Sequence, residues 1–158
     1  MSTYQYKECG LDYVFLENGF KIVESPYGKG VSIENEDELL VAIAEAVISS
    51  PRHMTGKELR FIRSVMGLSQ KRLGEFLGVT RGAIANVEDS KRLDAPLSDQ
   101  MDHLLRYVCA GYMKKDSALR QLIDIISEED DAGSISELTF KSCNRGHKWV
   151  KESTYKAA

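Results

Sequence analysis

The sequence has no hydrophobic run approaching the roughly 20 residues that span a bilayer, and its first nine residues lack the character of a secretory signal peptide. We therefore expect no membrane association and interpret the chain as cytoplasmic. Only three of the 158 residues are cysteines, namely Cys9, Cys109 and Cys143. Because they are odd in number and far apart, no disulfide framework is expected, and reduced thiols suit the cytosol.

Residues that bind metals or carry out catalysis are also scarce. Cys143 and His147 have C-x-x-x-H spacing, but a zinc site needs about four ligands and the other cysteines and histidines are scattered. No phosphate-binding loop, nucleophile–base pair or paired-carboxylate motif stands out. We therefore expect no metal, no cofactor and no enzymatic activity.

Charge is distributed unevenly along the chain. The net charge is −3, yet residues 52–92 carry nine Lys/Arg and four Asp/Glu, a net of +5. Residues 1–51 carry three Lys/Arg and nine Asp/Glu, a net of −6. Residues 93–158 carry nine Lys/Arg and eleven Asp/Glu, a net of −2. Positive charge confined to one segment is typical of a single module that contacts phosphate while the rest of the chain does not.

The N-terminal third, residues 1–51, is predicted to be a β-rich domain with one helix. Residues 4–33 are rich in β-branched and aromatic residues, which favour strands of a small antiparallel sheet. Asn18-Gly19 predicts a tight hairpin and residues 26–30 predict a second turn. The aromatic stripe at 4–20 has two interpretations, a core or interface and the wall of a ligand pocket.

Helices are predicted for most of residues 36–126. The first covers 36–49, with Asn35 as N-cap and Glu38 completing a capping box. Four more begin at Thr55, Ser69, Thr80 and Leu97, and a last one covers 116–126. Residues 52–126 therefore predict a five-helix domain, and the fold class is α+β. Residues 127–158 predict an acidic linker and a C-terminal strand that packs on the N-terminal sheet.

Residues 69–88 contain the pattern of two short helices that cross steeply. Gly78 stands where the turn needs a left-handed backbone, and Gly74 stands where close packing needs a small residue. Apolar residues at 73, 77, 79, 84 and 87 then face inward. The outer face is left with donors suited to phosphate and base edges, namely Ser69, Gln70, Lys71, Thr80, Arg81, Gly82, Ala83 and Asn86.

Over residues 55–108 the sequence resembles the Xre/Cro-repressor helix-turn-helix proteins, with a lambda-repressor-like domain. The matching features are Gln70, Leu-Gly before the turn, Gly-Val at the turn, and Ile84-x-x-x-Glu88. The resemblance implies that Ser69 and Gln70 contact phosphate, that Arg81 and Asn86 enter the groove, and that Arg63 and Glu88 form a structural ion pair. Two residues depart from the family pattern. Gly82 stands where a base-reading side chain is common, and Ser90 replaces the usual glycine after the recognition helix.

We assign the candidate contacts of this module in two groups. The candidate base-reading residues are Thr80, Arg81, Gly82 and Asn86. The candidate phosphate contacts are Ser69, Gln70, Lys71, Arg72, Lys91 and Arg92. For Arg81 the alternative is a phosphate contact, and for Lys71, Arg72, Lys91 and Arg92 it is a solvated surface charge.

The whole chain also resembles MqsA-class antitoxin regulators. The shared features are Tyr-x-Tyr-x-Glu-x-Gly-Leu-Asp-x-Val near the start, Pro-Tyr-Gly-x-Gly-Val, and Thr-Gly-x-Glu-Leu-Arg-Phe-Ile-Arg. That class binds zinc through paired N-terminal cysteines, but this chain has only Cys9 in that region, so zinc is not implied.

Three functional hypotheses follow. The first is a transcriptional repressor of its own operon. It binds double-stranded DNA at a palindromic operator as a homodimer, which is joined through its last two helices or its N-terminal sheet. The second is an antitoxin that neutralises a partner toxin through the acidic N-terminal domain. The third is a regulator whose N-terminal sheet senses a ligand.

Overall fold

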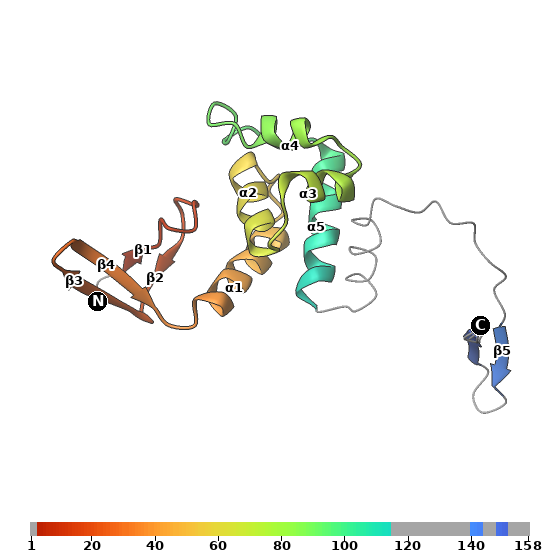
Figure 1. The fold of residues 1–158 in the computed structure, drawn as a ribbon, viewed down its shortest axis with the longest axis horizontal. Helices are drawn as coiled ribbons and strands as arrows, with labels where there is room; N and C mark the ends of the chain where they lie inside the picture. Colours follow the sequence, from red (N-terminus) through yellow and green to blue (C-terminus); the bar gives the residue numbers. More distant parts are fainter. Residues whose placement is uncertain (1–2, 115–139, 144–147, 152–158) are drawn as a thin grey trace, which may run out of the picture. The chain divides into compact units, whose positions relative to one another are not determined.

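A computed structural model describes residues 3–114, 140–143 and 148–151, and these residues form a mixed α and β structure (Figure 1). The α+β class expected from the sequence is confirmed at this level. The helices are α1 (Glu36–Ser49), α2 (Gly56–Val65), α3 (Gln70–Leu77), α4 (Arg81–Val87) and α5 (Asp99–Met113). The strands are β1 (Tyr4–Gln5), β2 (Phe15–Leu16), β3 (Phe20–Ser25), β4 (Gly28–Ile33), β5 (Phe140–Cys143) and β6 (Lys148–Lys151). The helix expected at 116–126 lies outside the described residues.

The N-terminal strands form two separate antiparallel pairs, so the prediction of one small sheet was wrong. β1 pairs with β2, and β3 pairs with β4. The prediction of a hairpin at Asn18-Gly19 was also wrong. These residues join β2 to β3, and the two strands are not paired with each other. Gly19 does have a positive φ of 76°, but its carbonyl accepts a hydrogen bond from the amide of Glu34 at 2.9 Å. The glycine therefore redirects the chain toward the end of β4 instead of closing a hairpin.

The second expected turn does close a hairpin. Ser25 pairs with Gly28 across the two residues Pro26 and Tyr27, and Gly28 has a φ of 126° that only glycine adopts readily. The pairing continues to Phe20 opposite Ile33. At that end Tyr4 packs on Phe20 with ring centroids 5.2 Å apart. An isolated two-stranded hairpin is only marginally stable in water, so this aromatic contact helps to hold it.

α1 begins and ends where the sequence predicts, but its N-terminus is built differently. Asn35 has a left-handed backbone (φ 47°, ψ 51°) and makes no side-chain capping bond, so the capping box expected with Glu38 is wrong. Negative charge at Glu36, Asp37 and Glu38 still favours this end of the helix dipole. The Tyr6 hydroxyl donates to Glu36 at 2.5 Å and ties the N-terminal segment to the start of α1.

The next helices are capped by the residues that the sequence indicates. Thr55 forms a capping box with Glu58 at the start of α2. The hydroxyls of Ser69 and Thr80 accept hydrogen bonds from the amides of Arg72 and Ala83, which fixes the starts of α3 and α4. α5 begins two residues later than expected because Ser98, and not a residue before Leu97, is its N-cap. Short polar side chains thus set each boundary by satisfying amides that lack partners in the first turn.

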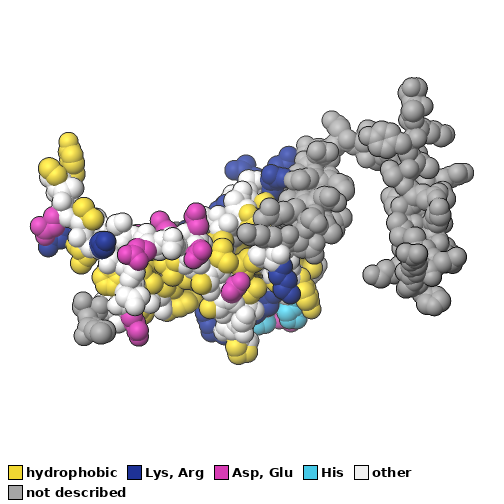
Figure 2. Space-filling model, turned by 90° about the horizontal axis from the view of Figure 1, so that it is seen from below, with side chains coloured by type: hydrophobic (Ala, Val, Ile, Leu, Met, Phe, Trp, Pro, Cys, Tyr) yellow, Lys and Arg dark blue, Asp and Glu magenta, His cyan; other side chains and the backbone are white. Residues whose placement is uncertain are grey.

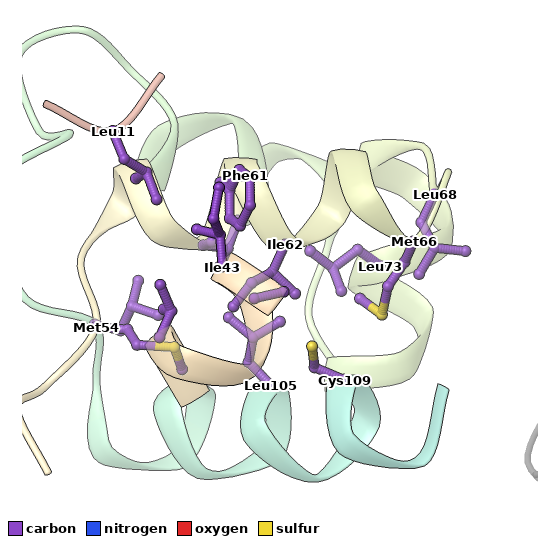
Figure 3. Packing of buried hydrophobic residues seen from close by; sticks show 14 of the residues in the cluster. Leu11, Ile43, Met54, Phe61, Ile62, Met66, Leu68, Leu73, Leu105 and Cys109 are labelled. Carbon is purple, nitrogen blue, oxygen red and sulfur yellow. The ribbon is translucent and has the colours of Figure 1, made fainter. Parts of the chain in front are cut away.

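The helices surround one hydrophobic cluster (Figure 3). Leu59 and Ile62 of α2, Leu73 of α3, Ile84 of α4 and Leu105 of α5 are all fully buried. Fully burying such a side chain stabilises the fold by about 1.5–3 kcal/mol, so the shared core holds α3 and α4 to the rest of the bundle. The cluster also includes residues from outside these helices, among them Tyr6, Leu11, Met54 and Leu97.

Asp102 and Arg106 of α5 clamp the segment between α1 and α2. Asp102 accepts from the Met54 amide at 2.8 Å and pairs with Arg106 at 2.8 Å. Arg106 donates to the carbonyls of Ile48, Ser50 and Arg52. Burial alone would raise the pKa of Asp102, but the hydrogen bonds from Arg106 and Met54 outweigh it and hold that pKa below its usual value.

Gly56 allows the first turn of α2 to touch the end of α4. A Cβ at this position would lie 2.2 Å from the carbonyl oxygen of Val87. We expect Gly56→Ala to lower the free energy of unfolding by about 1–3 kcal/mol, because backbone must shift to admit the methyl group. Urea-induced unfolding of the purified variant measures this.

Gly82→Ala is the matched control for Gly56→Ala. Gly82 is exposed on α4, and a Cβ there meets nothing closer than 3.8 Å. Alanine is a better helix former than glycine, so this variant should gain about 0.5–1 kcal/mol. Equal losses in both variants would contradict the close contact at Gly56.

Contacts between Cα atoms divide the chain into two units, residues 1–127 and 128–158. The division expected between residues 51 and 52 lies inside the first unit. In the second unit β5 and β6 pair with each other, with Phe140 opposite Lys151 and Cys143 opposite Lys148. The sequence led us to expect one strand here, whereas there are two. That this segment packs on the N-terminal strands stays a prediction, and the acidic run at 127–131 lies outside the described residues.

Among the described residues, no helix has both the length and the apolar character needed to cross a membrane.

Candidate nucleic-acid interface

The pair formed by α3 and α4 is built around two glycines. Gly78 ends α3 with a left-handed backbone (φ 67°, ψ 30°). Gly74 is buried, and a Cβ there would lie 2.7 Å from the carbonyl oxygen of Val79. The Val79 amide in turn donates to the Gly74 carbonyl at 2.8 Å. Both glycines thus do what the sequence predicted, since one permits the turn and the other permits close packing.

The outward face of α4 is polar and small. Thr80, Arg81, Gly82 and Asn86 are all exposed, whereas Ile84 on the inward face is fully buried. Ala83, expected on the outer face, is half-buried. Ala85 is exposed in its place, and its methyl group is of the kind that contacts a thymine methyl. The helical periodicity of 3.6 residues, counted from the inward-facing Ile84, could have predicted that Ala85 is exposed.

The residues considered for phosphate contacts lie on α3 and on the segment after α4. Ser69, Lys71, Lys91 and Arg92 are exposed, and Gln70 and Arg72 are half-buried. The Ser69 hydroxyl accepts from the Arg72 amide at 3.1 Å and retains its own hydrogen for donation. These side chains present hydrogen-bond donors and positive charge, which is the chemistry that phosphate oxygens require.

An ion-pair network ties α2, α3 and the end of α4 together. Arg63 donates to both carboxylate oxygens of Glu88, from Nε at 2.6 Å and from Nη2 at 3.0 Å. It also donates to the Leu68 carbonyl at 3.0 Å. Gln70 donates from Nε2 to Glu88 at 2.8 Å. Glu88 is buried, so this bidentate pair fixes the end of α4 relative to α2.

The Gln70 contact has a consequence for its expected role. Its amide nitrogen carries two hydrogens, and Glu88 accepts one of them. The bond to Glu88 therefore fixes the orientation of the Gln70 amide group and leaves its second hydrogen unused by that bond. The pairing of Gln70 with Glu88 could not be derived from spacing alone, because the two residues lie 18 positions apart.

Charged side chains of both signs are scattered over the visible surface, among hydrophobic and uncharged ones. Figure 2 shows acidic and basic side chains interspersed over the helices, and exposed hydrophobic side chains where the β3–β4 hairpin lies. In the parts of the chain that the structure describes, no three His, Cys, Asp or Glu side chains are placed to share a metal ion. Cys143 ends β5, and His147 lies outside the described residues.

Comparison of the chain with protein-family models, with curated proteins and with solved structures finds no match in any of the three.

Proposed function

We propose that this protein is a sequence-specific DNA-binding regulator, in which α3 and α4 form a helix-turn-helix of the Xre/Cro-repressor type. The observation that carries the proposal is the exposed face of α4, where Thr80, Arg81 and Asn86 project from a helix whose other side is buried through Ile84. Arginine suits guanine and asparagine suits adenine in the major groove. The net charge of +5 in residues 52–92 supplies the attraction to phosphate.

The regulator acts as a homodimer on a palindromic operator. One α4 helix reaches only a few base pairs, which is too little to select one site among many. Two copies on half-sites about one helical turn apart, or 34–36 Å, double the sequence that is read. A repressor of its own gene is the simplest regulator with this design.

The test is selection of bound duplexes from a random DNA library at about 150 mM salt, where phosphate contacts alone are weakened. We expect a recurring inverted repeat and a gel shift that random competitor does not abolish. Binding of all duplexes with equal affinity would contradict sequence-specific regulation.

Lys71 provides a separate prediction about phosphate. It is exposed in the first turn of α3, beside Gln70. Lys71→Ala should weaken binding to operator and random DNA alike, and should reduce the slope of log K against log salt by about 1. Fluorescence anisotropy titrations at several salt concentrations measure the slope. An unchanged slope would rule out a phosphate contact at this residue.

A second candidate function, the antitoxin, is favoured by the exposed hydrophobic residues of the β3–β4 hairpin. Ile22, Val23 and Tyr27 are 63%, 49% and 100% exposed. The hairpin belongs to the N-terminal third, residues 1–51, which has a net charge of −6. A basic partner protein would complement that charge. If an adjacent gene encodes such a protein, the two should copurify after coexpression. Ile22→Ser/Val23→Ser should abolish copurification and leave DNA affinity unchanged.

A further inference from the structure

A cavity of about 760 Å³ opens between the segment that precedes β2 and the helices α1 and α2. Its apolar lining includes Val14, Phe15, Ile43 and Val47, of which Phe15 is 57% exposed and Ile43 and Val47 are buried. Its charged residues are Asp12, Arg52, Lys57, Glu58 and Asp94. The volume lies within the range of about 300–1,000 Å³ that small-molecule sites occupy.

Glu58 lines the cavity, is buried and accepts three hydrogen bonds. Its Oε1 accepts from the Tyr13 hydroxyl at 2.7 Å and from Arg52, and its Oε2 accepts from the Thr55 amide at 2.8 Å. Arg52 also lies over the Tyr13 ring, 5.7 Å from its centroid. Burial, and then the bond to Glu58, raise the pKa of Tyr13, so its hydroxyl remains a donor. This network fixes the position of Glu58 and holds Tyr13 and Arg52 against the first turn of α2.

Two opposite charges on the rim keep capacity for a ligand. The guanidinium of Arg52 has five N–H groups, more than Glu58 and Tyr13 can use, and its side chain is 55% exposed. Asp12 lies 4.0 Å from Lys57, at the limit of an ion pair, because Lys57 pairs more closely with Asp94 at 2.8 Å. A donor group with spare capacity and a weakly paired carboxylate therefore line the same cavity as the apolar residues.

We propose that this cavity binds a zwitterionic α-amino acid with a large apolar side chain. Its carboxylate pairs with Arg52, its ammonium group pairs with Asp12, and its side chain covers Val14 and Phe15. A ligand with a single charge satisfies one rim group and leaves the other to water. A small amino acid makes both polar contacts but leaves the apolar surface exposed.

The cavity wall is joined directly to α4. Gly56 of the wall helix touches the Val87 carbonyl, and the Lys57 amide donates to the Leu93 carbonyl at 3.0 Å. An amino acid that holds residues 12–15 against α2 therefore changes the mobility of the segment that carries Lys91 and Arg92. The resulting change in DNA affinity rests on the proposed function, whereas binding of the amino acid does not.

The first experiment uses L-phenylalanine as the probe and follows the amides of the full-length chain by ¹H–¹⁵N NMR without DNA. We expect saturable shifts at Val14, Val47 and Arg52. Phenylacetate, which lacks the ammonium group, 2-phenylethylamine, which lacks the carboxylate, and glycine, which lacks the side chain, should each bind about tenfold or more weakly. No saturable shift up to about 10 mM L-phenylalanine, or equal binding of phenylacetate, overturns the proposal.

Two variants test the location. Ala46 is exposed on α1 and lines the cavity, so Ala46→Phe should fill it and abolish binding. Ala42→Phe is the matched control, because Ala42 is exposed one turn earlier, is not a lining residue, and side chains lean toward the N-terminus of a helix. Asp12→Asn should weaken binding about fivefold or more. Unchanged affinity in Ala46→Phe also overturns the site.

A gel shift on the selected operator, with and without L-phenylalanine, tests the coupling. Saturable NMR binding with no effect on the gel shift overturns the regulatory role alone. Absence of specific DNA binding overturns the proposed function and leaves the amino-acid site standing.

Discussion

Arg81→Ala and Asn86→Ala should each weaken binding to the selected operator by about 1–3 kcal/mol, which is roughly 5- to 150-fold, and change binding to random DNA little. Both side chains are exposed on α4, where they are five positions apart. A side chain that makes a bidentate contact with a base edge contributes only where that base is present. Anisotropy titrations with operator and random duplexes, at one salt concentration, measure the difference.

Arg81→Lys separates base reading from phosphate binding. Lysine keeps the charge but lacks the planar fork that matches guanine, so a base-reading Arg81 predicts nearly the full loss in this variant. Lys21→Ala removes a positive charge from the exposed β3 strand and is the control for net charge. Equal losses on operator and random DNA, with Arg81→Lys behaving as the unchanged protein, would mean that Arg81 contacts phosphate.

Local patterns predicted most of the helical part. Thr55, Ser69, Thr80 and Gly78 set helix ends through bonds or backbone angles that involve near neighbours, so the sequence carries that information directly. The Arg63–Glu88 pair joins positions 25 apart and was implied only by the family resemblance. The structure now gives it a physical basis in two hydrogen bonds.

The N-terminal strands were harder to predict because strand pairing depends on partners that are distant in sequence. Asn18-Gly19 has the composition of a hairpin turn, yet Gly19 bonds to Glu34 and β2 pairs with β1. The tight contact of Gly56 with Val87 and the contacts of Glu58 with Tyr13 and Arg52 were missed for the same reason. A glycine or glutamate in the first turn of a helix is common, and no local signal reveals what approaches it.

Arg63→Met should have the largest effect on stability. The side chain of Arg63 is 20% exposed and that of Glu88 is 5% exposed, so the substitution leaves a buried carboxylate without its charged partner, although Gln70 still donates to it. Removing one member of a buried ion pair costs about 3–5 kcal/mol, because the remaining charge keeps its desolvation penalty. We expect this loss in the free energy of urea-induced unfolding, which is measured by following the helical circular dichroism signal at 222 nm.

The double variant Arg63→Met/Glu88→Leu shows whether the buried charge is the cause. Replacing both members of a buried pair with apolar residues of similar volume is often close to neutral, so the double variant should recover most of the stability that Arg63→Met loses. Lys29→Met is the control, because its ion pair with Glu24 is about 75% exposed on both sides and such pairs contribute about 0–1 kcal/mol. A double variant as unstable as Arg63→Met would instead assign the loss to Arg63's bond to the Leu68 carbonyl and to its packing. Glu88 would then act mainly by orienting α4, and its substitution would lower the affinity for the operator more than the free energy of unfolding.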